Sequence, residues 1–407
     1  MPCHVLAQLP KDAHGGGGLF TWDRHPSLHA GNWLRVDFRA SLQFDWSIID
    51  PATAAEPPLY HFGRRRFGVD GVLFNRLEFQ VSRETVETEI PWKDVTGNVR
   101  IIPGLQVRGG RFRIPFSLEQ STIGTELDFI ERSRIAARLA PGRDTGAMVH
   151  GALFDRGLRY QLGVFEHDGD VAVTSANVRT GQRTVAGRMI VEPLRLLSVP
   201  KALHSVSLGG AATSGDVPAG LYGIRGRTVA SDTTFPAYFV NGNRRRTGLE
   251  LNWMPGPFSV RGEYIDLREQ RLGQDSRRED LPGMIQRGWY LSGTWVVTGQ
   301  ARVGGLDRGR YVPFLRKRWG AVELAARYEA IRLASDTASG LPSRSTRAFN
   351  AERQSDRVWT LGLNWFVTQW VKLQANLIHE RLEDSLRAPV PGVPSYWTYK
   401  FRLQFAL

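Results

Sequence analysis

The sequence predicts an all-β fold: a transmembrane antiparallel β-barrel of about 16 strands, with one loop folded into the pore. Three features lead to this prediction. Apolar and polar residues alternate strictly over long segments, the connections between these segments alternate between short and long, and no long apolar run is present. Strict alternation places apolar side chains on one face of a strand and polar side chains on the other. Because no run approaches the roughly 18 apolar residues that a membrane helix needs, a helical span is excluded, whereas barrel strands remain possible.

The longest alternating segment covers residues 34–46, with apolar residues from Leu34 to Trp46 on one face and polar residues from Arg35 to Asp45 on the other. Seven further segments alternate clearly, at residues 76–81, 158–164, 246–253, 259–264, 359–365, 371–377 and 397–407. Eight weaker candidates lie near residues 65–73, 98–113, 146–154, 184–193, 203–212, 221–230, 288–297 and 319–329. Together these segments predict about 16 strands, an even number that suits a porin-sized barrel.

The connections predict two different rims. Tight turns are expected at residues 74–75, 155–157, 255–257 and 368–369, and longer polar segments at 268–286, 335–356 and 381–395. Short turns on one rim and long loops on the other are typical of outer-membrane barrels. So many strands enclose an interior too wide for side chains to fill, so water occupies it and the apolar face meets lipid. We therefore expect outward side chains at Phe38, Tyr160, Trp253, Trp365 and Phe401, and inward side chains at Arg39, Arg261, Lys372 and Arg402.

The chain divides into a flexible N-terminal segment, residues 1–32, and a barrel domain, residues 33–407. The first segment has no period and contains a glycine run at residues 15–18. Met1 to Pro10 lacks the charged and apolar regions of a secretory signal, so the signal has been removed or the given start lies downstream of the true one. The single cysteine, Cys3, excludes a disulfide framework and a cysteine-based metal site.

The formal net charge of +13 comes almost entirely from arginine, and it indicates anionic partners: nucleic acid, acidic lipid or small anions. By the alternation, the inward basic residues of the clearest strands are Arg35, Arg39, Arg76, Arg159, Arg246, Arg261, Lys372, Lys400 and Arg402. The inward acidic residues of the same strands are Asp37, Asp45, Glu78, Glu250 and Glu263. A positive lumen attracts anions, and guanidinium groups match phosphate oxygens bidentately. The alternative is that charges of both signs serve hydration and cross-strand pairing.

Other functions find little support in the sequence. There is no glycine-rich phosphate loop, no HExxH motif and no nucleophile elbow, so we expect no enzyme, no cofactor and no metal. His379 and Glu380 are interpreted as a solvated pair at a strand end. A general porin and a membrane-embedded hydrolase remain alternatives, and the hydrolase would need a Ser–His pair at one rim. A soluble basic β-protein that binds nucleic acid is disfavoured because the apolar faces are too long and regular.

Several motifs, in order, carry a family resemblance. Residues 110–119 read GRFRIPFSLE, residues 129–133 read FIERS and residues 140–143 read APGR. Further matches are RRRFGVDG at 64–71, GPF at 256–258 with Glu263-Tyr264, GWY at 288–290 with Thr298-Gly299, ELAARY at 323–328, LGLNW at 361–365 and RLQ at 402–404. Over about residues 35–407 the chain resembles the phosphate-selective porin O and P family. The last strand ends on Leu407, where such barrels usually end on Phe, and Phe405 lies two residues earlier.

The resemblance implies a homotrimer of 16-stranded barrels in the bacterial outer membrane, in contact with outer-membrane lipid. It also implies a loop, within residues 117–140, that folds into each pore and selects phosphate or polyphosphate-like anions. Because the chain is nearly free of lysine, an anion preference is better supported than a preference for phosphate alone. The candidate pore-lining residues are Arg39, Arg65, Arg66, Ser121, Thr122, Arg132, Arg261, Lys372 and Arg402. For Arg132, a salt bridge to Glu119 or Glu131 is an equally good interpretation.

Overall fold

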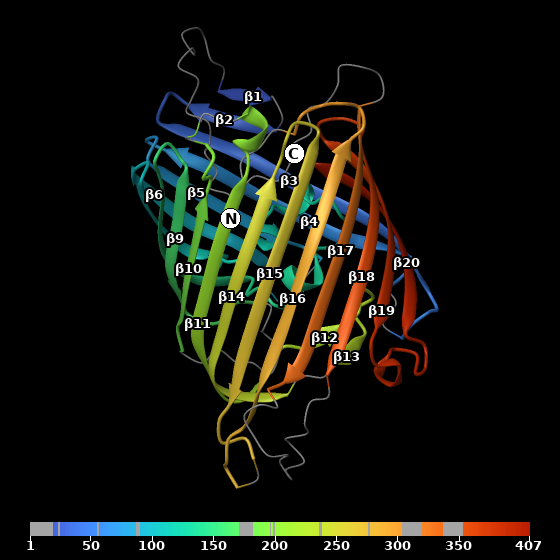
Figure 1. Ribbon diagram of the computed structural model, residues 1–407. Coiled ribbons are helices and arrows are strands. Elements are labelled where there is room, and N and C mark those ends of the chain that lie inside the picture. Colours follow the sequence, from blue (N-terminus) through green and yellow to red (C-terminus); the bar gives the residue numbers. More distant parts are fainter. Residues whose placement is uncertain are drawn as a thin grey trace.

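A computed structural model describes residues 19–407 apart from 23–24, 55–56, 87–89, 171–181, 196, 198–199, 236–237, 276, 303–319 and 337–352. In the described residues, 16 antiparallel strands form a closed barrel (Figure 1), because the last strand pairs with the first over Trp397–Ala406 and Ser41–Asp50. The wall strands are β3 (Leu34–Asp50), β4 (Tyr60–Leu73), β5 (Leu77–Glu84), β6 (Trp92–Ile102), β7 (Leu105–Arg113), β8 (Arg143–Leu153), β9 (Leu158–Phe165), β10 (Thr184–Val191), β11 (Ser207–Tyr222), β14 (Phe239–Trp253), β15 (Phe258–Arg271), β16 (Leu281–Val296), β17 (Ala321–Ser335), β18 (Gln354–Phe366), β19 (Val371–Leu382) and β20 (Ser395–Ala406). Among the described residues, no helix is both long enough and apolar enough to cross a bilayer.

The alternation along the strands is confirmed. Phe38 and Phe401 lie on the outer face, where 39% and 53% of their surface is exposed. Arg261, Lys372 and Arg402 lie on the opposite face and are buried inside the barrel. Closure pairs the backbone groups of every wall strand with two neighbours, which an apolar environment requires.

The predicted number of strands is right because two errors cancel. The candidate at residues 98–113 covers two strands, β6 and β7, which are joined by a turn at Pro103 and Gly104. The candidate at residues 221–230 is no wall strand, because β11 ends at Tyr222 and the chain then leaves the barrel wall. Each error changes the count by one strand, in opposite directions.

The two rims differ, although less sharply than predicted. The four tight turns lie at one rim, together with the chain end at Leu407, and we call this the turn rim (top of Figure 1). The 272–280 and 383–394 connections lie at the other rim, the loop rim. The turn rim has two longer connections, 192–206 with η2 (Lys201–Leu203) and 297–320. Because long loops of such barrels face the exterior of the cell, the loop rim is the extracellular one.

The N-terminal segment differs in part from the prediction. Within residues 1–32, which were expected to form a flexible segment, β1 (Phe20–Trp22) and β2 (Pro26–Ala30) form a hairpin. β2 pairs with Leu34–Asp37 of β3, on the same edge of β3 that β20 occupies further along. The barrel wall therefore begins before residue 33. Residues 1–18, including Cys3, lie outside the described residues.

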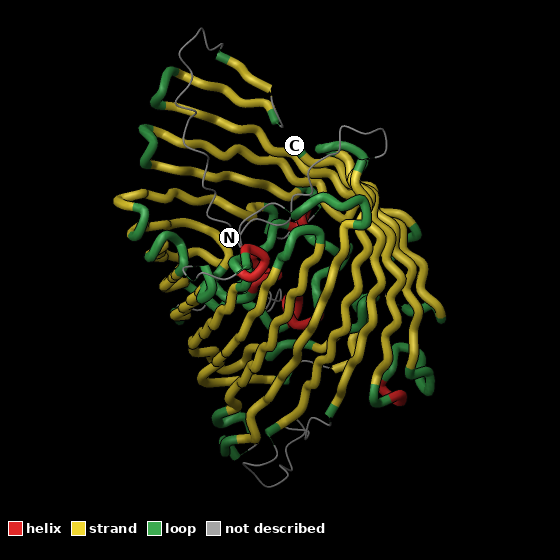
Figure 2. Tube along the Cα trace, turned by 45° about the horizontal axis from the view of Figure 1, so that its top comes forward, coloured by secondary structure: helices red, strands yellow, loops and turns green. Residues whose placement is uncertain are grey.

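The long connection between β7 and β8, residues 114–142, contains α1 (Leu118–Ser121), η1 (Gly124–Glu126) and α2 (Arg134–Arg138). Short helices are visible near the centre of the ring of strands (Figure 2). Ser117 and Ser133 cap α1 and α2, because their hydroxyls accept the backbone N–H groups of Gln120 and Ala136. This local capping explains why a segment between two strands forms helical turns.

A second connection, residues 223–238, joins β11 to β14 and contains β12 (Gly226–Arg227) and β13 (Thr233–Phe235). It packs with the 114–142 connection in one buried apolar cluster, together with side chains of β15, β16 and β17. The members of the cluster include Phe116, Ile135, Leu139, Ile224, Phe235, Ile265, Leu267, Met284, Ile331 and Leu333. The inner face is thus polar on most strands but apolar where these two connections cover it. A further short helical turn, η4 (Ser385–Arg387), lies in the last loop.

Candidate functional site

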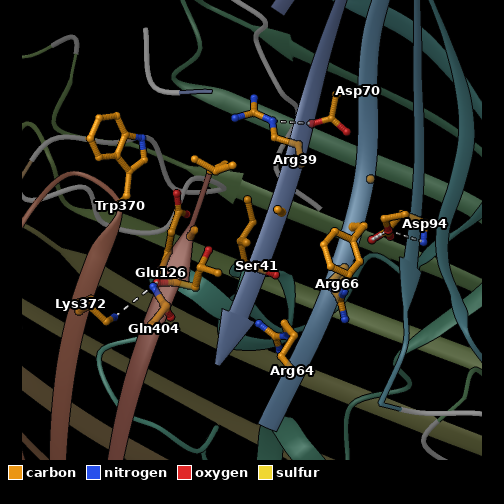
Figure 3. A pocket seen from close by; sticks show the side chains of 18 of the residues that line it. Arg39, Ser41, Arg64, Arg66, Asp70, Asp94, Glu126, Trp370, Lys372 and Gln404 are labelled. Carbon is orange, nitrogen blue, oxygen red and sulfur yellow. Dashed lines mark hydrogen bonds and ion pairs between the residues drawn. The ribbon is translucent and has the colours of Figure 1, made fainter. Parts of the chain in front are cut away.

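A cavity of about 310 Å³ opens between the 114–142 connection and the inner wall of the barrel. The connection contributes Ile123, Thr125 and Glu126, and the wall contributes residues of β3 to β8 on one side and of β19 and β20 on the other. Figure 3 shows Arg39, Arg64 and Arg66 on two neighbouring strands, facing Lys372 and Gln404 across the space.

Cationic side chains outnumber acidic ones around this cavity. The cationic lining residues are Arg39, Arg64, Arg66, Arg113, Arg143 and Lys372. The acidic ones are Asp70, Asp94 and Glu126. Two arginines are matched by their own carboxylate: Arg39 Nε lies 3.3 Å from Asp70, and Arg143 donates two hydrogen bonds of 3.1 Å to Asp94. The surplus positive charge therefore belongs mainly to the other four residues.

Arg64 and Arg66 share one carboxylate. Their Nε atoms lie 3.8 and 3.5 Å from Glu84 Oε2, so a single negative charge faces two guanidinium groups. The guanidinium of Arg64 also lies directly against Gly124 of the connection, where a side-chain carbon would overlap it. Glycine at this position therefore allows the charged group to reach the narrow space beside η1.

Arg113 and Arg143 lie on either side of the 114–142 connection. They are register partners, as the last residue of β7 and the first of β8. Directly opposite residues of antiparallel strands point to the same face, so both guanidinium groups project inward. Arg113 donates a 2.9 Å hydrogen bond to the carbonyl of Thr122, while its Nε has no hydrogen-bond partner among the described residues. The start and end of the connection thus bring two positive charges to the cavity.

Side chains from around the barrel bind the backbone of the connection. Lys372 donates to the carbonyl of Leu127 at 2.9 Å, Gln404 to that of Thr125 at 2.9 Å, and Arg402 to that of Ile130 at 3.1 Å. Four strands away from β19 along the wall, Glu263 of β15 accepts the backbone N–H groups of Leu118 and Glu119 at 2.9 and 2.7 Å. The connection is therefore fixed to β15, β19 and β20 at the same time.

Three of the nine residues singled out from the sequence line this cavity: Arg39, Arg66 and Lys372. Arg402 is buried and forms a bidentate pair with Asp45, with both N–O distances 2.6 Å. Arg261 is buried elsewhere on the inner wall, where its Nε donates to Asn252 at 3.1 Å. Both side chains point inward as predicted, but neither lines the cavity, because both are bonded to residues of the barrel wall.

Thr122 and Arg132 form hydrogen bonds within the connection, whereas Ser121 joins it to Arg188 of the wall strand β10. The hydroxyl of Ser121 accepts from Arg188 at 3.2 Å, and that of Thr122 donates to the carbonyl of Leu118 at 3.0 Å. Arg132 donates to the carbonyls of Glu119 and Thr122. Burial lowers the pKa of Arg132 to about 10, against the opposing effect of Glu119, so the group is still charged at neutral pH. Its main contacts are structural, and it lies outside the cavity lining.

Arg65 is placed differently from the prediction. It is the register partner of Leu42 on the outer face, and its guanidinium lies 5.0 Å from the ring of Phe62. Arg64 and Arg66 pair with Gln43 and Ser41 of the inner face, so both side chains face inward. Adjacent strand residues point to opposite faces, and this rule alone shows that Arg65 and Arg66 could not both line the lumen.

Sequence reasoning missed Arg64, Arg113 and Arg143. Arg64 could have been found from its spacing of two residues to Arg66. Arg113 and Arg143 flank the connection in the chain, but their closeness depends on the pairing of β7 with β8. That pairing is a long-range contact, and the alternation of a single strand does not reveal it.

In the described part of the chain, one group brings three possible metal-binding side chains together: Asp144, Glu166 and His167. Both carboxylate oxygens of Asp144 already accept backbone N–H groups, from Thr145 at 2.8 Å and His167 at 2.6 Å. The group is therefore explained by the local structure of the β8 and β9 ends.

A closed barrel of 16 strands, with an apolar outer face and a charged inner face, defines an outer-membrane porin. The chain belongs to the phosphate-selective porin O and P family, whose model matches residues 40–407. It is 28% identical over 404 residues to Porin O of Pseudomonas aeruginosa, covering 93% of this chain and 88% of that protein.

Solved structures show the same fold at low sequence identity. The trimer form of OmpT, an outer membrane protein of Vibrio cholerae, has a TM-score of 0.57 and 10% identity, covering 92% of this chain and all of that one. The anion-selective porin from Comamonas acidovorans has a TM-score of 0.54 and 13% identity, with the same coverage. The channel DcaP of Acinetobacter baumannii has a TM-score of 0.55 and 7% identity, covering 93% of this chain and 99% of that one.

Proposed function

We propose that this porin passes small anions, phosphate among them, by passive diffusion along the cavity between the 114–142 connection and the β3–β8 wall. The observation that carries the proposal is the excess of cationic over acidic side chains around the cavity, and above all the pair Arg64 and Arg66 facing one carboxylate. Low-dielectric walls focus the field of such groups, which raises the local concentration of anions. The family, and the names of the relative and of the Comamonas porin, agree with this selectivity.

We infer that the 114–142 connection, including the predicted 117–140 segment, narrows the path of the ions. Its hydrogen bonds to β15, β19 and β20 support a position across the lumen. Arg64, Arg113 and Arg143 then lie where the path is narrowest, and few water molecules screen their charge there. Phosphate and polyphosphate-like anions suit this site, because a guanidinium group can donate two parallel hydrogen bonds to phosphate oxygens.

We further propose a channel role without catalysis, and a homotrimer. The charged groups around the cavity already serve pairing and anchoring, and its lining has the hydroxyls of Ser41, Ser82, Thr125 and Thr368 but no histidine that could activate them. This set lacks the activated nucleophile that a hydrolase needs. The trimeric form of a structural neighbour supports the assembly, which crosslinking of the purified protein would test.

A planar-bilayer measurement tests the proposed function. The purified full chain is inserted into a bilayer that separates concentrated from dilute KCl, and the reversal potential is recorded. An anion-preferring pore makes the dilute side negative, because chloride crosses faster than potassium. Phosphate added at constant ionic strength should then reduce the chloride current by occupying the arginine sites. A dilute side that becomes positive would contradict the proposal and favour a cation-preferring general porin.

A further inference from the structure

The outer face of the barrel carries a row of arginines near the loop rim. One arginine projects outward from each of six consecutive strands, β14 to β19, which lie side by side across the front of Figure 1. All six side chains are exposed, and for Arg268 and Arg287 the exposed fractions are 60% and 44%. We call this row the outer arginine belt, and it consists of Arg245, Arg268, Arg287, Arg332, Arg357 and Arg381.

The register places these arginines opposite one another in pairs. Arg245 is the partner of Arg268, Arg287 of Arg332, and Arg357 of Arg381. Directly opposite residues have Cβ atoms about 4.5 to 5.5 Å apart, and like charges at that position destabilise a sheet. Three such pairs in one row therefore need compensation by negative charge.

The protein supplies little of that compensation. One carboxylate, that of Asp266, pairs with two of the belt arginines, at 2.9 Å from Arg268 and 2.6 Å from Arg287. Within the described residues, Arg332, Arg357 and Arg381 have no ion pair and no side-chain hydrogen bond. In the part of the chain that the structure describes, half of the belt thus carries guanidinium groups without a protein partner.

The height of the belt on the wall identifies these surroundings. Trp289, Tyr328 and Trp359 form a continuous row on three neighbouring strands, with ring centroids 5.4 and 4.5 Å apart. Such aromatic rows mark the boundary between hydrocarbon and head groups. On β18, Trp365 lies six residues from Trp359 toward the turn rim, or about 20 Å along the strand. The apolar side chains of Leu361 and Leu363 lie between these two tryptophans.

The belt lies on the other side of this aromatic row. Arg287 and Arg357 follow Trp289 and Trp359 by two residues toward the loop rim, which is about 7 Å along a strand. The belt therefore lies at the level of the head groups of the outer leaflet, and it faces lipid and not the lumen.

We propose that the outer arginine belt binds the phosphate groups of a phosphorylated glycolipid in the outer leaflet. A glycolipid that carries two or more phosphates can bridge neighbouring arginine pairs, and guanidinium groups bind phosphate bidentately. The acyl chains of the same lipid then pack below, on Leu361, Leu363 and the aromatic row. This site is separate from the lumen, so a test of lipid binding is independent of the proposed anion conduction.

Lipid A serves as the probe. The parent protein, in micelles of uncharged detergent, is titrated with fluorescent lipid A and with lipid A from which the phosphates have been removed. The test variant replaces Arg332, Arg357 and Arg381 by glutamine. The matched control replaces Arg195, Arg277 and Arg278 by glutamine, which removes the same charge from connections outside the belt. A further variant replaces the three belt arginines by lysine and so keeps the charge.

We expect the parent to prefer lipid A to its dephosphorylated form. We expect the glutamine variant to bind lipid A at least about tenfold more weakly than the parent does. The control should bind like the parent, and the lysine variant should keep most of the affinity, which also excludes a loss caused by misfolding. Equal binding of lipid A by the parent and the glutamine variant would overturn the proposal. Displacement of lipid A by inorganic phosphate at equal concentration would overturn the assignment to a lipid.

Discussion

Arg64 lies directly against Gly124, so the strand that carries the charge and the connection that faces it touch without an intervening side chain. The contact joins β4 to η1 at the cavity that we propose as the ion path. Because the guanidinium occupies the space that a side-chain carbon would need, any larger residue at position 124 must move it. The size of residue 124 therefore controls the position of one charge in the lumen.

Replacing Gly124 by alanine should reduce the anion preference while leaving the barrel intact. The added methyl group moves only the flexible end of Arg64, so the unfolding free energy should change by less than about 1 kcal/mol. The measurement is the reversal potential in a KCl gradient, together with the thermal midpoint. Gly97→Ala, at an exposed position of β6 where a methyl group meets open space, is the control for conduction. An unchanged reversal potential for Gly124→Ala would contradict the assigned position of Arg64.

Replacing Glu263 by alanine should loosen the 114–142 connection. The change removes the acceptor of two backbone N–H groups, from Leu118 and Glu119, and the partner of the Tyr290 hydroxyl at 2.8 Å. Each buried group left without a partner costs about 1–3 kcal/mol. We expect a larger single-channel conductance with more current noise. Glu279→Ala, on an exposed loop, should behave like the parent. Equal conductances of Glu263→Ala and Glu279→Ala would refute the anchoring role of Glu263.

The pair formed by Glu131 and Lys400 gives a pH dependence of stability. Lys400 lies 2.7 Å from Glu131 and, against the effect of burial, lowers the pKa of this loop carboxyl to about 2. A carboxyl with a lowered pKa stabilises the folded protein above its unfolded pKa, and this contribution is lost as the pH falls toward the folded value. The gap in thermal midpoint between the parent and Glu131→Gln should therefore be constant from pH 8 to about pH 5 and shrink from about pH 4.5 to pH 2. A gap that widens with acid would contradict the pairing.

Much of the barrel could be predicted from the sequence, because its outer and inner faces differ at every second residue. Phe38 and Arg39 show this directly, since lipid and lumen impose opposite polarity on neighbouring positions. The inward position of Arg64 and Arg66 follows from the same alternation, because Phe67 occupies the outer face. The approach of Arg113 to Arg143 could not be predicted, because it depends on how two strands pair.

The inward position of the apolar residues Ile265 and Leu267 could not be predicted from the sequence either. They are covered by two connections that are far away in the sequence, and the cluster exists only in the folded chain. For the same reason, Ser121 and Thr122 were interpreted as pore-lining, although their hydroxyls are bound within the folded protein. Local pattern determines which face a strand residue occupies, whereas loop contacts determine which inward residues meet the cavity.

The most direct test of the account compares neighbouring arginines that point to opposite faces. In a KCl gradient, the reversal potential is measured for the parent, for Arg64→Gln/Arg66→Gln and for Arg65→Gln. At about 4 Å in water, one charge changes the energy of an ion by about 1 kcal/mol. The double variant should therefore lower the ratio of chloride to potassium permeability by roughly fivefold or more for each guanidinium removed. Arg65→Gln, on the outer face, should keep the reversal potential of the parent. An equal loss in both variants, or none in the double variant, would contradict the proposed ion path.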